Sequence, residues 1–394
     1  MEKQKGLATV ETMLSGDRLS RAKELHNEGK KVMGYMCCFV PVEMLTALDI
    51  VPFRILGDCN EVTTEADKYL ENIMCSFIRS SFDLAMKDAF SFADGIIFTH
   101  SCDAIVKTWE YWRYFKPNAF EWYINVPHII KPSSDEFYAK QLDRFQKALE
   151  DYTGQKLTNE KLRRAIRLHN RNGQYLRQLN ELRKENPPRI TGAEMRKTLI
   201  ACLSLPVEEA NTLLEEILEE VKNRIPTLPA SNHRIMIYGP EMDNDFVDLV
   251  EECGASVVID DVCIGTRYYS KDVDWGIEPM DGIRRRYLEQ IVCPRVYRRP
   301  AEDKVPAGQT YDRQDDLDLR LSYIRDYAED WQADGVIMYL LRYCDSHEFD
   351  APDVRDYLQA ANFPSLFLEG DYTVTKEQYK TRIQAFLEML DAQV

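Results

Sequence analysis

The sequence lacks the short motifs that assign a chemistry by themselves. It contains no HExxH, no GxxxxGKS or GxxxxGKT and no GxGxxG, so zinc proteases, P-loop NTPases and dinucleotide-binding domains have no support. None of its ten cysteines forms a CxxC pair, and zinc-ribbon and two-cluster ferredoxin spacings are therefore absent. The ligands of any metal centre must come from segments that are distant in the sequence.

Basic charge and long apolar runs are also scarce. The 394 residues carry a formal net charge of −16 with a pI near 5.0, which argues against nucleic-acid binding because phosphates need a basic face. A local basic pocket for an anionic substrate is compatible with this charge. No apolar run approaches the roughly 18 residues of a membrane span, and residues 1–18 lack the apolar core of a signal peptide. We expect a cytoplasmic protein of two or three domains.

Two stretches of the chain share an unusual order of residues. Each begins with Ala-Asp-Gly, continues into a short apolar run and ends on Cys-Asp; they are Ala93 to Asp103 and Ala333 to Asp345. Asp-Gly marks a turn, and the apolar runs are too short for buried helices. Each stretch therefore predicts a buried strand that carries a cysteine at its C-terminal end, where ligands of open α/β sheets gather.

A second correspondence lies upstream of each copy. Residues 71–75, ENIMC, precede the first copy, and residues 289–293, EQIVC, precede the second. The chain therefore resembles two related halves, each of which carries a pair of cysteines.

Strand signals alternate with helices along most of the chain. Strands are expected near 31–36, 51–57, 96–98, 120–126, 234–239, 254–260, 336–338 and 365–368, whereas residues 135–225 show helical spacing alone. Such alternation implies parallel sheets with helices on both faces. We predict an α/β fold with two Rossmann-like parallel-sheet domains related by a pseudo-repeat, at 1–134 and 229–394. A helical insert or cap at 135–228 is expected between them.

The cysteines differ in what their positions indicate. A disulfide framework is not expected in a reducing compartment, and Cys59, Cys202 and Cys253 fit ordinary burial. A metal role is favoured where a cysteine lies at a strand end or a helix start and is duplicated. Thiolates suit both iron–sulfur clusters and zinc, and the spacing does not separate the two. The candidates are Cys75, Cys102 and Cys344, followed by Cys37, Cys263 and Cys293.

Several stretches, in order from about residue 30 to the C-terminus, carry a resemblance to a known family. They are KVMGY (31–35), CFVPVE (38–43), CSFIRSS (75–81), CD (102–103), DDVCIGTRY (260–268), YCD (343–345), EGD (369–371) and TRIQAF (381–386). Together they resemble the family of 2-hydroxyacyl-CoA dehydratase and ATP-dependent benzoyl-CoA reductase subunits. Each stretch alone is a weak signal, but the ordered set is specific.

The resemblance implies a cofactor. Each of two subunits in one enzyme component would carry a 4Fe-4S cluster, held here by Cys75, Cys102 and Cys344, with Cys37 as a less certain fourth ligand. Cys102 and Cys344 would then face each other across the cleft between the two halves. Cys293, the counterpart of Cys75 in the second half, is expected to be an echo that has lost its metal.

The resemblance also implies partners and a reaction. The implied partners are an acyl-CoA substrate, a homologous second subunit or a second copy of the chain, and an ATP-hydrolysing iron–sulfur activator. In the dehydratases, the activator's low-potential electron converts the 2-hydroxyacyl thioester to a ketyl radical anion, the hydroxyl leaves, and the electron returns.

Three alternatives stay open at this point. The chain is also similar to subunits of benzoyl-CoA reductases, which consume electrons in reducing an aromatic ring. A relative with a double-cubane cluster would use three cysteines per half, and the six candidate cysteines meet that count. The non-enzymatic alternative is a subunit that only relays electrons or scaffolds its partner.

Five polar residues are candidates for roles near such a cluster. Glu43, at the expected helix start, is a candidate for proton transfer, although an acidic residue there also serves as a helix-dipole partner. His100, two residues before Cys102, is a candidate donor to a cluster sulfur or a thioester oxygen. Arg79, Arg267 and Tyr268 are candidates for meeting CoA phosphates or tuning the cluster, with surface salt bridges as the plainer explanation.

Overall fold

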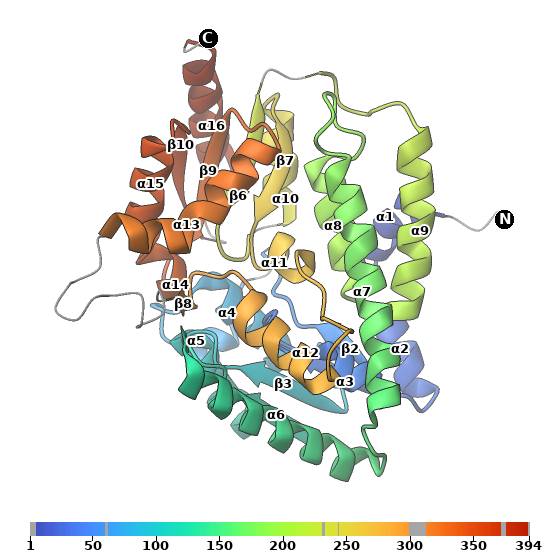
Figure 1. The fold of residues 1–394 in the computed structure, drawn as a ribbon. Coiled ribbons are helices and arrows are strands. Elements are labelled where there is room, and N and C mark those ends of the chain that lie inside the picture. The colour runs from blue at the N-terminus through green and yellow to red at the C-terminus, as the bar shows by residue number, and fades with distance from the viewer. Residues whose placement is uncertain are drawn as a thin grey trace.

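Two four-stranded parallel sheets form the centre of the protein (Figure 1). The structure is a computed structural model, and it describes residues 5–59, 62–230, 233–242, 244–298, 313–371 and 376–392. The inner strands of both sheets are buried on both faces. Along β3(Gly95–Thr99), for example, Ile96 and Phe98 pack into one core cluster and Ile97 into another. Continuous apolar runs, rather than alternating ones, are what such doubly covered parallel strands require.

The first sheet has the strand order β2-β1-β3-β4, with every pair parallel. Its helices precede the sheet or connect its strands. In chain order the elements are α1(Leu7–Ser15), α2(Ser20–Asn27), β1(Lys31–Tyr35), α3(Val42–Thr46), β2(Ile50–Arg54), the 3-10 turn η1(Ala66–Lys68), α4(Ser76–Met86), β3, α5(Asp103–Phe115) and β4(Phe120–Ile124).

The second sheet has the order β10-β9-β6-β7, again with parallel pairs. When strands are numbered by chain order within each half, both sheets have the order second, first, third, fourth; in the second half these strands are β7, β6, β9 and β10. The predicted fold class of two Rossmann-like parallel sheets is therefore confirmed. The elements are β6(Arg234–Tyr238), α10(Asn244–Glu252), β7(Ser256–Asp261), α11(Thr266–Tyr269), α12(Pro279–Arg285), the π-helical turn η2(Arg286–Gln290), α13(Arg313–Asp330), β9(Gly335–Leu341), α14(Asp345–Glu348), α15(Ala351–Ala360), β10(Ser365–Gly370) and α16(Lys376–Asp391).

The Ala-Asp-Gly motif anchors the third strand of each half to the first. Asp94 Oδ2 accepts a hydrogen bond from the Val32 backbone N–H at 2.7 Å, and Asp334 Oδ2 accepts one from the Arg234 N–H at the same distance. The glycine that follows each aspartate is required by close packing. A Cβ on Gly95 would lie 2.8 Å from Phe120 atoms, and one on Gly335 would lie 2.8 Å from the Phe386 ring. The repeated motif therefore fixes the register between the first and third strands of each half.

Four helices occupy the chain between the sheets: α6(Pro132–Thr153), α7(Asn159–Glu181), α8(Gly192–Cys202) and α9(Val207–Asn223). They are divided between the halves. Helix α6 contacts β4 of the first sheet, α8 contacts β7 and α10 of the second half, and α7 contacts α3, α11 and α12 (Figure 1). The segment therefore lies against both halves. The division of the chain at residues 134 and 228 stays a prediction.

Two helices have local features that bear on the site. Helix α5 begins at Asp103, directly after Cys102, and α12 continues as a π-helical turn from Arg286. A two-stranded sheet of β5(Ile129–Ile130) and β8(Tyr297–Arg298) joins the halves, and its two-residue strands are too short to give a sequence pattern. None of the described helices has the length and apolar character to cross a membrane.

We predict that Arg183 is essential for stability. It is fully buried after α7, where Nη1 lies 2.8 Å from Asp260 Oδ2 and Nη2 donates to the Val257 carbonyl at 2.9 Å. Arg183→Met leaves the Asp260 carboxylate unpaired and should lower the free energy of unfolding by about 3–5 kcal/mol, measured by urea denaturation. Arg177→Met, which breaks the half-exposed pair with Asp272, should cost at most about 1 kcal/mol. Equal losses would contradict the prediction.

Candidate functional site

Six cysteines from the two halves of the chain line one cavity of about 80 Å³. The cavity lies where the carboxyl ends of the two sheets meet, since four of its cysteines follow β1, β3, β7 and β9 by two or three residues. All six candidates from the sequence are therefore together. They are Cys37, Cys75, Cys102, Cys263, Cys293 and Cys344.

Three of these cysteines hold the same local position. Cys75, Cys102 and Cys344 are the N-cap residues of α4, α5 and α14. The repeat explains two of them, because Cys102 follows β3 by three residues and Cys344 follows β9 by three residues. An N-cap side chain lies beside the free N–H groups of the first helical turn, which is a favourable place for a thiolate.

The other three cysteines come from less regular backbone. Cys37 has a φ of 77°, a left-handed conformation that is uncommon for a residue with a Cβ and concentrates at functional sites. Cys263 follows β7, and its N–H donates to the Pro240 carbonyl at 3.2 Å. Cys293 follows η2 and was expected to be an echo without metal, yet it lines the same cavity as the rest.

Burial keeps most of these thiols protonated in the metal-free protein. It raises the pKa of Cys75 to about 11 and that of Cys102 to about 12. The pKa of Cys344 is raised well above its ordinary value by burial and then by the neighbouring Cys75, Cys263 and Cys102. Burial raises the pKa of Cys263 in the same way, with further contributions from Cys293 and Cys37. A negative charge on one of these thiols therefore makes ionisation of its neighbours less favourable.

Cys37 is the exception among the six. The thiol of Cys38 donates a hydrogen bond to it, and the charge of Arg54 is nearby, so the pKa of Cys37 is lowered well below its ordinary value although the residue is buried. The pKa of Cys38 rises correspondingly because that thiol keeps the shared proton. Cys37 is therefore the thiol of this cavity that ionises most readily.

Two buried arginines line the cavity with unused hydrogen-bonding capacity. Nε of Arg54 and both Nε and Nη1 of Arg295 have no hydrogen-bond partner within the described part of the chain. Arg295 is held in place by Nη2, which donates to the Val126 carbonyl at 2.8 Å, and by the Phe39 ring. An unpaired buried cation is costly unless an anion faces it. Sequence reasoning missed both residues, although a lone arginine in an apolar strand, VPFRIL, was a usable signal.

These residues fit an anionic iron–sulfur cluster better than a single metal ion. Within the described ranges, no three His, Cys, Asp or Glu side chains converge as ligands of one ion would. A cluster places each thiolate on its own iron and so needs ligands that stand farther apart. The arginine N–H groups would compensate its negative charge. One carboxylate, Glu241, also lines the cavity, but its Oε1 is paired with Arg196 at 2.7 Å.

A chain of buried polar groups leads to Cys344. Asp261 accepts two hydrogen bonds from Arg267, whose Nη1 lies 2.8 Å from His347 Nε2. Because a guanidinium only donates, His347 Nε2 must accept, so a neutral His347 carries its proton on Nδ1. Nδ1 lies 3.4 Å from Cys344 Sγ. Burial and Arg267 lower the pKa of His347, which keeps the ring neutral and its N–H directed at the sulfur.

Its buried partners therefore hold the Arg267 side chain in the protein interior. Its side chain is 1% exposed and paired with Asp261, so it cannot reach a CoA phosphate without breaking that pair. Arg79 lies outside the cysteine cavity and pairs with Asp67 at 2.6 Å. His100 is also absent from the cavity lining, and its Nδ1 lies 3.0 Å from Asn125 Oδ1. The functional role expected for His100 stays a prediction.

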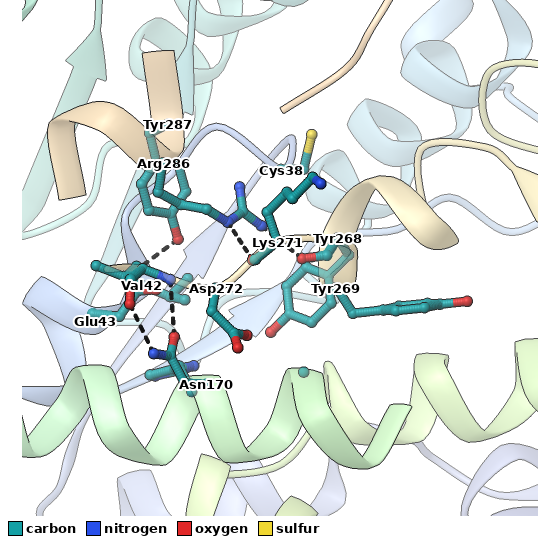
Figure 2. Close-up of a pocket in the computed structure, with 13 residues that line it drawn as sticks. Cys38, Val42, Glu43, Asn170, Tyr268, Tyr269, Lys271, Asp272, Arg286 and Tyr287 are labelled. Carbon is teal, nitrogen blue, oxygen red and sulfur yellow. Dashed lines mark hydrogen bonds between the residues drawn. The ribbon is translucent and has the colours of Figure 1, made fainter. Parts of the chain in front are cut away.

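Glu43 and Tyr268 line a separate, smaller cavity of about 30 Å³ (Figure 2). The Tyr287 hydroxyl donates to Glu43 Oε2 at 2.8 Å, and Arg286 lies beside it with Nη1 unpartnered among the described residues. Cys38, the neighbour of Cys37, lines this second cavity as well. The volume suits one or two water molecules rather than a substrate. Proton transfer by Glu43 stays a prediction.

Comparison with known proteins assigns the chain to a family. The model of the family described as "2-hydroxyglutaryl-CoA dehydratase, D-component" matches residues 37–390. The chain belongs to this family. The family expected from the sequence is thereby confirmed.

Individual family members differ in their reactions. The chain is 24% identical over 371 residues to the (R)-phenyllactyl-CoA dehydratase beta subunit of Clostridium sporogenes, covering 93% of this chain and 94% of the relative. It is 27% identical to a benzoyl-CoA reductase subunit from Thauera aromatica, covering 83% and 82%. It is 26% identical to a putative dehydratase subunit of Escherichia coli (strain K12), covering 93% of each. The chain is thus an enzyme subunit of the 2-hydroxyacyl-CoA dehydratase or benzoyl-CoA reductase type. Because these relatives are named as subunits, a multi-subunit complex is implied.

The lowered pKa of Cys37 gives a prediction for this family member before iron is added. In a pH titration of the metal-free chain, thiolate absorbance in the ultraviolet should develop at lower pH than for an ordinary thiol, because the pKa of Cys37 is lowered. Cys37→Ser should remove that absorbance. Cys102→Ser should leave it unchanged, since a thiol with a pKa of about 12 is protonated at pH 7. Arg54→Met should move the Cys37 titration to higher pH. An unchanged titration curve in Cys37→Ser would refute the assignment.

Proposed function

We propose that this chain is an iron–sulfur subunit of a 2-hydroxyacyl-CoA dehydratase-type enzyme, in which a low-potential electron from an ATP-driven activator serves radical elimination of water. The observation that carries the proposal is the convergence of six cysteines on one cavity. When bound, the cluster would supply one-electron chemistry at low potential. Cys75, Cys102 and Cys344 would hold a 4Fe-4S cluster, with Cys37 as an additional candidate ligand.

The protein's own residues support an electron-carrying role. Arg54 and Arg295 line the cavity with N–H groups that have no partner among the described residues, and His347 directs Nδ1–H to Cys344. Hydrogen bonds to cluster sulfurs and buried positive charge stabilise the more negative, reduced form and so raise a reduction potential. These groups would make the site hold an added electron more readily than thiolates alone.

The size of the cavity bears on where the acyl-CoA binds. Ligand pockets for molecules of drug size commonly have about 300–1,000 Å³, whereas the cysteine-lined cavity has about 80 Å³. A cluster and an acyl thioester do not fit there together in this conformation. This supports electron delivery by the chain to a substrate that binds after opening of the site or on another subunit.

A second candidate is a double-cubane cluster reductase. The specific observation in its favour is that Cys37, Cys263 and Cys293 line the same cavity as the first three cysteines. Six thiolates could hold two linked cubanes, and no thiol of the set would then be left without a role. Benzoyl-CoA reductase-type ring reduction is the third candidate, since one relative carries that name.

Cysteine substitutions distinguish one cubane from two. After anaerobic iron–sulfur reconstitution, Cys75→Ala, Cys102→Ala and Cys344→Ala should each abolish iron binding, because three thiolates are the minimum set for the cluster. Under the first candidate, Cys263→Ala and Cys293→Ala should retain about four irons per chain. Under the second, wild type should bind about eight, and these two variants should lose at least half.

The control is Cys202→Ala, which removes a buried cysteine outside the cavity lining. It should keep the full iron content of the wild type. Zinc or no metal in anaerobically purified wild-type protein would overturn both candidates.

Turnover separates dehydration from reduction. The chain, with its partner subunit, an ATP-hydrolysing activator and a reductant, should release water from a 2-hydroxyacyl-CoA while consuming far less than one electron per product, since the electron returns. Benzoyl-CoA supplied in a parallel reaction should not be converted. Stoichiometric consumption of electrons with benzoyl-CoA would instead establish ring reduction.

A further inference from the structure

An open groove of about 420 Å³ lies on the outside of the Cys75, Cys102 and Cys344 group. Its lining includes the immediate sequence neighbours of all three cysteines: Met74, Asp103, Tyr343 and Asp345. The cysteine side chains themselves line the cavity on the inner side. One layer of backbone therefore separates the groove from the site of the expected cluster.

The groove combines exposed apolar groups with aromatic rings. Ile73 is 70% exposed, and Tyr69, Tyr111 and Tyr343 are 38–39% exposed. Apolar side chains gathered at one hollow and surrounded by polar ones are typical of a protein-binding surface. Tyr343 also has a φ of 66°, a strained conformation of the kind that accumulates at functional positions.

The charges in the groove are mainly negative. Glu71, Asp103 and Asp345 are exposed carboxylates in its lining, and one cation, Lys107, lies among them. Arg342, next in the chain to Tyr343, is paired with Glu369. Carboxylates beside tyrosine rings suit lysine and arginine side chains, which bind both groups. The same charges disfavour an acyl-CoA, whose phosphates are anionic.

We infer that this groove is the docking surface for an electron-transfer protein that presents a basic face with apolar contacts. The inference rests on the proposed function, because it gives the groove a purpose only if a cluster occupies the cavity behind it. A second copy of the chain is a poor occupant. Each copy carries a net charge of −16, and a symmetric contact would place the same carboxylates opposite each other.

The test uses the reconstituted full chain and a basic probe protein. Chains reduced with titanium(III) citrate are mixed with ferric cytochrome c, and one electron passes to the haem iron, which becomes ferrous. The bimolecular rate should fall as salt is added, because attraction between opposite charges is screened. Glu71→Lys should lower the rate at low salt about tenfold, and Ile73→Ser should lower it several-fold. Rates are normalised to those with a neutral quinone on the same preparation.

A matched control reverses a charge elsewhere. Glu215→Lys changes an exposed carboxylate on α9 by the same amount, and its rate with cytochrome c should stay within about twofold of wild type. Equal effects of Glu71→Lys and Glu215→Lys would show that only net charge matters and would overturn the inference. Faster transfer to an acidic flavodoxin than to cytochrome c at low salt would also overturn it.

Two further outcomes have distinct meanings. If wild-type protein binds no iron, the proposed function fails before the groove is tested. If wild type binds iron and sediments as a dimer that Ile73→Ser dissociates, the groove binds a second copy and the inference fails while the proposed function stands. Iron content must equal wild type in Glu71→Lys and Ile73→Ser, because both positions lie within four residues of Cys75.

Discussion

The site depends on one constraint: several thiols are buried together, and burial opposes their ionisation. A thiol with a pKa of 11 or 12 releases its proton only when a cation takes the proton's place. Three side chains around the cavity partly compensate the negative charge of an ionised thiol. Arg54 lies beside Cys37, Arg295 presents free N–H groups, and His347 points an N–H at Cys344. These groups compensate part of the negative charge that ionised thiols would bring. Under the proposed function, a metal core would balance the rest.

The fold brings the thiols together because two similar halves face each other by the same end. In each half the Asp of Ala-Asp-Gly fixes the register of the third strand against the first, and the cysteine follows three residues after that strand. A repeated strand pairing therefore produces a repeated cysteine position. The element that follows this cysteine differs between the halves. Cys102 precedes the long helix α5, whereas Cys344 precedes the single turn of α14. His347, three residues after Cys344 in that turn, places its Nδ1 3.4 Å from the Cys344 sulfur.

The sequence predicted the parts of this arrangement that rest on local patterns. Apolar runs ended by turn residues indicated the eight main strands, and duplication indicated the related halves. Contacts made across the chain had no such pattern. Arg54 and Arg295 are 241 positions apart. The apolar run around Arg54 marked it as unusual, but nothing in the sequence indicated that both arginines lie beside the cysteines. The same holds for Arg267, whose buried partners Asp261 and His347 are visible only once β7 and α14 are neighbours.

Charges of opposite sign gather on the two sides of the cysteine site. Inside the cavity, buried arginines face the thiols, whereas the groove outside is lined mainly by carboxylates. Buried charge acts in a medium that screens it little, and under the proposed function it would set the affinity of the site for electrons. Exposed charge acts through water and is screened within about 10 Å at 0.1 M salt, so it would influence the approach of a partner. With opposite signs on either side of one backbone layer, the proposed subunit would stabilise an electron within and still attract a basic protein that delivers it.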